Sequence, residues 1–262
     1  MVKFLTLCVF AIVSCSSFAQ HIAKETYPSG VLKGKGLIED SAKTGIWTFW
    51  YEDSTKMSEG RYLDGRRDGK WEEWYPNGKK WSLAFFNDGL PNGRYEDFDM
   101  NGAKVEEGEM KMGIPDGAFK TWYNSGLLRS SGPIANGRKI GKWTTFYENG
   151  VQHSEGEYKL GKRVGLWEEW HEGGKMKSRG IYFAGVPHGI WEYWHKDGAM
   201  QMQGAYIGGK KEREWTEWHD NGQMKNQGSY VNDVENGRWN YWNFDGSPDK
   251  EVEHVQKQPY GR

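Results

Sequence analysis

Aromatic side chains recur along this chain at a fixed spacing of 24 residues. The clearest copy runs from Gly141 to Val164, and the same pattern begins again at Gly165. Steps of 24 residues from Gly45 reach Gly69, Gly93, Gly117, Gly141, Gly165, Gly189, Arg213 and Gly237, so that glycine is replaced once. A period this regular, with no insertion, indicates a tandem repeat protein in which each copy packs on its neighbours.

Each copy carries two rings, three residues apart. The first ring row is Trp47, Trp71, Tyr95, Phe119, Trp143, Trp167, Trp191, Trp215 and Trp239. The second ring row is Trp50, Trp74, Phe98, Trp122, Phe146, Trp170, Trp194, Trp218 and Trp242. A third, less uniform row runs from Tyr62 to Tyr230 and follows a small residue by two positions. Large rings bury much apolar area, so we expect the two main rows to form the core between repeats.

Turn signals separate the ring-bearing segments. Asn77-Gly78, Asn149-Gly150 and Asp197-Gly198 are typical of tight primed turns with positive φ at both central residues. In the clearest copy they predict a hairpin of strands 142–147 and 152–158, followed by a longer turn around 161–165. Glycine is too frequent for stable helices, because each one costs about 1 kcal/mol in a helix interior.

The spacing of the rings leaves one structural choice open. Residues three apart on a regular strand face opposite sides of a sheet. Either both faces are covered, or each strand carries a bulge that brings the two rows together. In both cases the sequence predicts an all-β protein, an elongated single-sheet β-meander of 24-residue β-hairpin repeats. The structural positions are Gly69, Trp71, Trp74, Gly78, Gly141, Trp143, Phe146, Gly150, Gly165, Trp167, Trp170, Gly189, Trp191 and Trp194.

The ends of the chain differ from its repeats. Residues 1–19 join a basic Lys3, a short apolar run and small residues, which predicts an export signal cleaved after Ala19. The alternative is a lipoprotein signal with lipidated Cys15, so we expect a periplasmic or secreted protein, or one anchored in the cell envelope by lipid. The apolar run is too short to span a membrane, and no later segment predicts a transmembrane helix.

The remaining boundaries follow from the period. Residues 20–26 are predicted to be a spacer, 27–44 an N-terminal half-repeat that caps the array, and 45–246 the tandem repeats. Residues 247–262 lose the glycine positions and are predicted to form a C-terminal edge strand and tail. Both cysteines, Cys8 and Cys15, lie in the export segment, so the repeats have no thiol for disulfides, catalysis or zinc.

Composition narrows the possible partners. The formal net charge is −1, with 35 basic and 36 acidic residues interspersed, which argues against nucleic-acid binding. With 15 Trp, 14 Tyr and 11 Phe, aromatic residues must supply most of the apolar burial. Such rings also stack on sugars, so glycan binding remains an alternative.

Two motifs resemble a known repeat family. The segments GRYLDGRRDGKW from Gly60 and GEYKLGKRVGLW from Gly156 resemble MORN repeats, and WEEWYPNG from Trp71 is similar to the variant MORN repeats of YwqK-type antitoxin proteins. The resemblance covers about residues 27–246 and implies β-hairpin repeats. It also implies a scaffold, a partner-binding array or a toxin-neutralising protein, although an export signal does not fit a cytoplasmic antitoxin.

Candidate chemistry is sparse. One repeat position alternates between two ring types, Tyr51, Tyr75, Tyr123, Tyr147, His171, His195 and His219, and we take this turn row as a candidate partner-binding surface. Equivalent residues of adjacent hairpins should lie about 10 Å apart, too far to share a metal ion. The adjacent acids of Glu72-Glu73 should point to opposite faces, so they do not form a glycosidase pair.

These observations predict no enzyme activity, cofactor or metal. They predict an exported scaffold that binds a protein partner through an extended sheet surface. The alternatives are an extracellular glycan-binding protein with exposed aromatic rows and an antitoxin or immunity-like protein of the cell envelope.

Overall fold

The computed structural model describes residues 20–255 and contains one sheet of 22 strands. The predicted export signal 1–19, with Cys15, and residues 256–262 lie outside the described part. The strands are β1 (His21–Thr26), β2 (Leu32–Glu39), β3 (Ala42–Trp50), β4 (Lys56–Leu63), β5 (Arg66–Trp74), β6 (Lys80–Asn87), β7 (Leu90–Phe98), β8 (Lys104–Lys111), β9 (Ile114–Pro115), β10 (Gly117–Trp122), β11 (Leu128–Ala135), β12 (Arg138–Lys139), β13 (Gly141–Phe146), β14 (Gln152–Lys159), β15 (Lys162–Trp170), β16 (Met176–Phe183), β17 (Val186–Trp194), β18 (Met200–Ile207), β19 (Lys210–Trp218), β20 (Met224–Val231), β21 (Val234–Trp242) and β22 (Pro248–His254).

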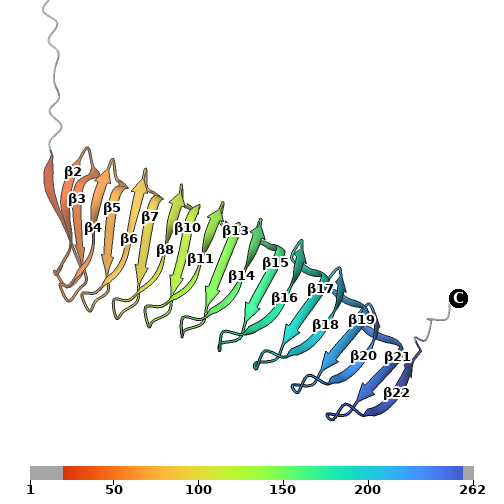
Figure 1. Ribbon diagram of the computed structural model, residues 1–262. Coiled ribbons are helices and arrows are strands. Elements are labelled where there is room, and N and C mark those ends of the chain that lie inside the picture. Colours follow the sequence, from red (N-terminus) through yellow and green to blue (C-terminus); the bar gives the residue numbers. More distant parts are fainter. Residues whose placement is uncertain (1–19, 256–262) are drawn as a thin grey trace, which may run out of the picture.

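The sheet is an open antiparallel meander. Strands that follow one another in the sequence pair with each other, and Figure 1 shows them succeeding one another in an elongated, gently curved layer. In two places one strand is interrupted: β9 and β10 both pair with β8, and β12 and β13 both pair with β11. The predicted all-β, single-sheet meander of tandem hairpins is confirmed.

The turns at the Asn-Gly sites are not the predicted primed turns. Gly150 N–H donates to the Tyr147 carbonyl at 2.9 Å and has a φ of 83°, whereas Asn149 keeps a negative φ. This is a turn followed by one left-handed residue, as in a three-residue hairpin loop with a glycine bulge. The prediction was wrong because asparagine acts here through its side chain. The carboxamide oxygen of Asn149 accepts the Val151 N–H at 2.9 Å.

Primed turns occur at the opposite end of the hairpins, between repeats. Leu160 and Gly161 have φ values of 51° and 81°, and the flanking Lys159 and Lys162 are paired. Positive φ at both central residues defines a two-residue primed turn. The predicted longer turn around 161–165 is therefore a short turn followed by a bulge at Gly165, whose φ is 66°.

The two ring rows lie on opposite faces of the sheet. The bulge precedes the first ring, and β15 pairs regularly with β14 from Trp167 to Glu169. Side chains alternate along this stretch, so Trp167 and Trp170 point to opposite sides. Of the two alternatives open to the sequence, the one in which both faces carry rings is correct. We call the side of the first ring row the tryptophan face and the other side the opposite face.

The core lies on the tryptophan face without a second layer over it. Trp167 is only 2% exposed, because its ring lies flat over Gly156 of the preceding strand. Tyr158 and Tyr182 meet it edge-on, with centroids at 5.1 and 6.0 Å, and the Arg163 guanidinium covers it at 4.2 Å. Edge-to-face rings and cation–π contacts thus replace the missing layer. The other buried members of the row are Trp47, Trp71, Tyr95, Trp143, Trp191, Trp215 and Trp239.

The second ring row is half-buried. Lysines from neighbouring strands cover parts of it: Lys56 Nζ lies 4.3 Å from the Trp74 ring centroid, and Lys104 Nζ lies 5.6 Å from that of Trp122. The expectation of a core between repeats thus fits the first row closely and the second row only in part. The exposed parts of these rings are therefore accessible to another molecule.

The two ends of the array differ from the internal repeats. Residues 20–26 were predicted to be a spacer, but His21–Thr26 forms β1 and pairs with β2. The first hairpin is therefore complete rather than a half-repeat, although Ala23 stands where later copies have a ring. The expected C-terminal edge strand is present as β22, which pairs with β21 and carries Asp249, Glu251 and Glu253 along the open edge. Charges of this kind discourage further strand pairing.

Burial of tyrosines predicts a loss of stability at alkaline pH. Burial raises the pKa of Tyr230 to about 12, with smaller contributions from Glu235 and Glu217. In the unfolded chain the phenol ionises near 10, so between pH 10 and 12 only the unfolded form loses this proton and is favoured by it. Tyr230 therefore stabilises the fold below pH 10, and this contribution is lost as the pH rises to 12. The expected loss is about 1 kcal/mol after solvent screening.

The free energy of unfolding of the parent and of Tyr230→Phe, measured by urea denaturation at pH 8 and pH 11.5, tests this expectation. The difference between the two proteins should shift in favour of the phenylalanine variant at the higher pH. A difference that does not change with pH contradicts it.

Candidate binding surfaces

The side chains of the turn row predicted from sequence form hydrogen bonds within the protein. Tyr147 Oη donates to the Trp170 carbonyl at 2.8 Å, and His171 Nε2 donates to the Trp194 carbonyl at 2.8 Å. Tyr51, Tyr75, Tyr123, His195 and His219 make the same bond to the carbonyl 23 residues further on. The row is half-buried and fastens each turn to the next. Its role as a partner-binding surface stays a prediction.

The candidate metal and acid positions do not converge. Within residues 20–255 no three side chains among His, Cys, Asp and Glu are grouped so as to hold a metal ion. Glu72 bonds Lys80 at 2.7 Å on the opposite face, and Glu73 bonds Arg67 at 2.8 Å on the tryptophan face. The two acids are thus separated by the sheet, as the alternation of side chains requires.

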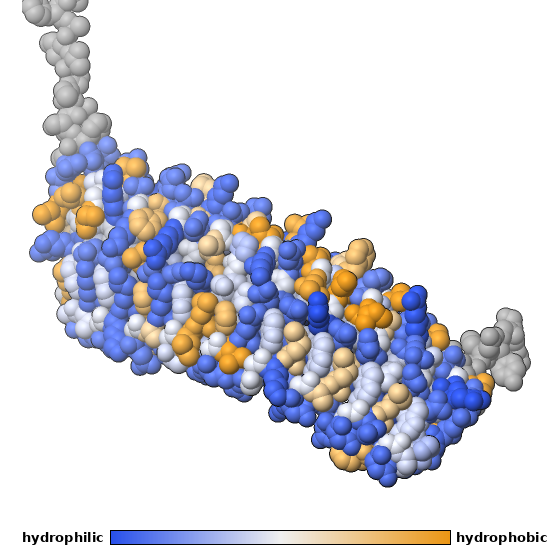
Figure 2. Space-filling view, viewed as in Figure 1, coloured by the Kyte–Doolittle hydropathy of each residue, from blue (hydrophilic) through white to orange (hydrophobic). Residues whose placement is uncertain are grey.

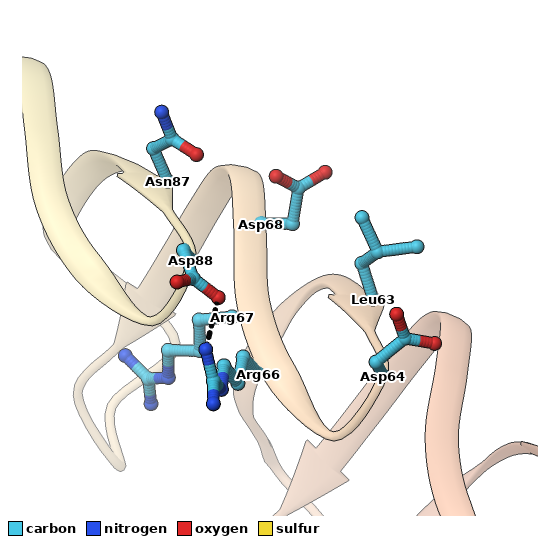
Figure 3. Close-up of a pocket in the computed structure, with 7 residues that line it drawn as sticks. All are labelled: Leu63, Asp64, Arg66, Arg67, Asp68, Asn87 and Asp88. Carbon is cyan, nitrogen blue, oxygen red and sulfur yellow. Dashed lines mark hydrogen bonds and ion pairs between the residues drawn. The ribbon is translucent and has the colours of Figure 1, made fainter.

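A small charged hollow lies between adjacent primed turns near the N-terminal end. Figure 3 shows its lining, where Arg66 of β5 reaches over to Asp88 of the next turn and forms an ion pair. Both side chains are exposed, so the pair contributes little stability. A hydrogen bond from Gly89 N–H to the Arg67 carbonyl at 2.9 Å ties the same two turns together. This hollow is part of the packing between repeats.

An exposed apolar patch distinguishes the C-terminal half of the sheet. It lies on the opposite face next to the primed turns of β14 to β18. Phe183 is 69% exposed, Ile181 49% and Ile190 56%. Leu160, Leu166, Val186 and Ile207 complete the outer patch. Figure 2 shows apolar surface gathered along the upper margin of this half.

Strand pairing makes the outer patch continuous. Leu166 pairs with Ile181, Phe183 with Val186, and Ile190 with Ala205, so four neighbouring strands, β15 to β18, carry apolar side chains on one face. The sequence analysis did not identify this patch. The signal was present as differences between copies. Lys70, Arg61 and Lys111 stand in some earlier copies at the positions of Leu166, Ile181 and Phe183, whereas other earlier copies have the apolar residues Ile46, Phe85 and Leu63 there. The repeat pattern is defined by the residues that the copies share, whereas the patch is formed by residues that differ between copies.

Cations border the outer patch on one side. A hollow of about 720 Å³ is lined by Leu160, Val164, Ile181 and Phe183 together with Arg138, Lys159 and Lys162. All three cations are exposed, and within residues 20–255 none of them forms an ion pair. A contiguous exposed apolar surface with a polar rim is typical of an interaction site.

The fold and these surfaces define a class: an open β-hairpin repeat scaffold with its core on one face and a partly apolar surface on the other. Four segments, residues 67–88, 139–160, 163–183 and 213–232, match the MORN repeat variant. The chain is a MORN repeat protein.

Other comparisons add little. No curated protein is significantly similar to this chain. Among solved structures, one of TcdB2-TccC3 without its hypervariable C-terminal region covers 84% of this chain at 10% identity and a TM-score of 0.21, and TcdB2-TccC3 itself covers 89% at 12% and 0.17. This chain spans only 14% and 16% of the length of those chains. Likeness at these TM-scores carries no argument about function.

The described residues 20–255 include no helix long and apolar enough to cross a membrane.

Proposed function

We propose that this chain is an exported, non-enzymatic scaffold that binds a protein partner through the opposite face of its sheet. The observation that carries the proposal is the outer patch, in which exposed apolar side chains from neighbouring strands meet on one face of the sheet. An open sheet of repeats offers a long, rigid surface for such binding. MORN repeat proteins in general act as binding scaffolds, which agrees with this role.

The side chains in and beside the outer patch indicate which kind of protein segment would bind there. Phe183 and Ile181 supply apolar contact area, and Arg138, Lys159 and Lys162 supply unpaired positive charge at one border. A protein segment that presents apolar residues next to carboxylates is complementary to both features. Export of the chain places this partner in the cell envelope or outside the cell.

Site-specific photo-crosslinking tests the proposal in cells that make the full chain. A photoreactive phenylalanine at position 183 is expected to give one discrete adduct with another protein. The matched control carries the same group at Lys111, which has the same repeat position and lies outside the outer patch, and should give none. The double variant Ile181→Asp, Phe183→Asp should weaken binding of the purified partner about tenfold or more, because it places charge in the contact. Equal adducts at both positions, or unchanged affinity of a folded double variant, would contradict the proposal.

The structure bears differently on the two alternatives, a glycan-binding protein and a toxin-neutralising protein. A glycan-binding platform needs an exposed row of rings, whereas the first ring row is buried except for the half-buried Phe119, and the second is half-buried. The toxin-neutralising alternative also requires a protein partner, so identification of the crosslinked protein decides it.

A further inference from the structure

The tryptophan face carries unbalanced positive charge in the middle of the array. In five of the nine copies a cation covers the first-row ring, and in three of these five the residue six positions later is an acid. Arg67 pairs with Glu73 at 2.8 Å, and Arg163 pairs with Glu169 at 3.4 Å. Lys139 covers Trp143 at 3.9 Å in the same way, but the position six residues later is Thr145. Lys139 therefore lacks the acid that Arg67 and Arg163 pair with.

Other cations gather around Lys139. A hollow of about 330 Å³ over Trp143 is lined by Lys139, Arg129 and Arg163 and by His153. Within residues 20–255 neither Lys139 nor Arg129 forms an ion pair. Burial lowers the pKa of Lys139, and the charges of Arg163 and Arg129 lower it further. Like charges repel, so their convergence in a half-buried hollow is a cost that an anion would offset.

Hydroxyl groups border the same hollow. The Thr145 and Ser154 hydroxyls lie 2.7 Å apart, and Ser130 makes the equivalent contact with Thr121 at 2.7 Å. Ser154 is buried, so its hydroxyl lies close to the sheet. In four of the other eight copies the position of Thr145 holds a carboxylate, at Glu73, Asp97, Glu169 and Glu217. This hollow therefore combines positive charge with neutral hydrogen-bond donors, the chemistry that recognises an oxyanion.

We propose that the hollow over Trp143 binds a sulfate or phosphate group, either as the free anion or as a substituent on a sugar chain. Lys139 and Arg129 provide the charge, and the Ser130 and Thr145 hydroxyls donate to the anion's oxygens. The site lies on the other face of the sheet from the outer patch and shares no residue with it. Its failure would leave the proposed protein-binding function untouched.

Titration calorimetry of the full chain with sodium sulfate, sodium phosphate, a sulfated dextran and neutral dextran, at constant ionic strength set with sodium chloride, tests the site. Saturable binding of one or more of the three anions is expected, with none of neutral dextran. Tighter binding of sulfated dextran than of sulfate identifies a sugar-borne group, and equal or weaker binding identifies the free anion. Lys139→Gln and Arg129→Gln should each weaken binding about tenfold or more, since each removes a charge-assisted contact.

Lys211→Gln is the matched control. Lys211 covers Trp215 at 4.4 Å in the same repeat position, but in a copy that keeps an acid at Glu217. The Lys211→Gln variant should bind the anion as the parent does. This result would show that weaker binding by Lys139→Gln comes from loss of the anion site and not from removal of a lysine that covers a tryptophan ring. An equal loss in Lys211→Gln, unchanged affinity in both Lys139→Gln and Arg129→Gln, or no saturable binding of any anion would overturn the proposal.

Discussion

Replacing Gly180 by alanine is expected to unfold the repeats around it or to lower the free energy of unfolding by about 3 kcal/mol or more. A Cβ atom at this position would lie 2.2 Å from Cδ2 and 2.3 Å from Cε2 of Trp191. The indole is 4% exposed and is held by a hydrogen bond from its Nε1 to the Ile181 carbonyl at 3.1 Å, so it has little freedom to move. Overpacking of this kind forces the ring or the strand out of place.

The chain itself contains a related case. At the corresponding position one copy has Ala84, and the ring paired with it is Tyr95 rather than tryptophan. A methyl group at this position thus occurs together with a smaller ring, which is directed toward Gly108 of the following strand, where an added Cβ would lie 2.8 Å from the Tyr95 Cε1. This pairing agrees with steric exclusion as the reason for glycine in the other copies.

Gly173→Ala is the control for Gly180→Ala. Gly173 has no positive φ, and an added Cβ would meet nothing within 4 Å. Alanine there should leave stability unchanged or raise it slightly, because it restricts the unfolded chain. Urea denaturation followed by circular dichroism compares the two variants. Equal stability of Gly180→Ala and Gly173→Ala would show that the indole does not require a bare backbone.

Truncation of the first ring row should cost far more than truncation of the second. Trp167→Ala is expected to lose about 3–5 kcal/mol, the usual cost of removing a buried aromatic ring. It removes the ring that Tyr158, Tyr182 and Arg163 contact, as well as a hydrogen bond from Nε1 to the Glu157 carbonyl at 3.2 Å. No second layer can close over the gap.

Trp170→Ala, three residues further along the same strand, provides the comparison. Its ring lies on the opposite face and is half-buried, so we expect about half the loss or less. Equilibrium unfolding in urea gives both values, and the stability of neighbouring repeats is expected to fall with the first variant because each copy depends on its neighbours. Equal losses would mean that the two faces contribute alike to the core.

The repeat architecture could be predicted from the sequence because its cause is local and recurrent. A ring, a glycine and a turn residue at fixed spacing specify a hairpin, and equal copies can only pair in series. The turn types were assigned to the wrong ends because Asn149 can serve a turn by positive φ or by its side chain, and only the hydrogen bond to Val151 shows which. The prediction of a spacer over residues 20–26 was wrong because this segment has no ring of its own. Strand β1 is held in the sheet by pairing with β2.

The surfaces were less predictable than the fold. The tyrosine and histidine turn row attracted attention as polar rings, but its hydrogen bonds to the next turn depend on how adjacent hairpins stack. The outer patch and the hollow over Trp143 both lie where one copy departs from the others. Their residues are close in space only because consecutive strands pair.

The sequence by itself determined the period, the strands and the recurring glycine positions, since these follow from contacts within one copy or between adjacent copies. Only the tertiary structure decided that the two ring rows occupy opposite faces, because this depends on a bulge placed before Trp167 rather than after it. It also decided which departures from the repeat meet on one surface. Leu166 and Ile181 belong to different strands, and pairing across the sheet makes them neighbours.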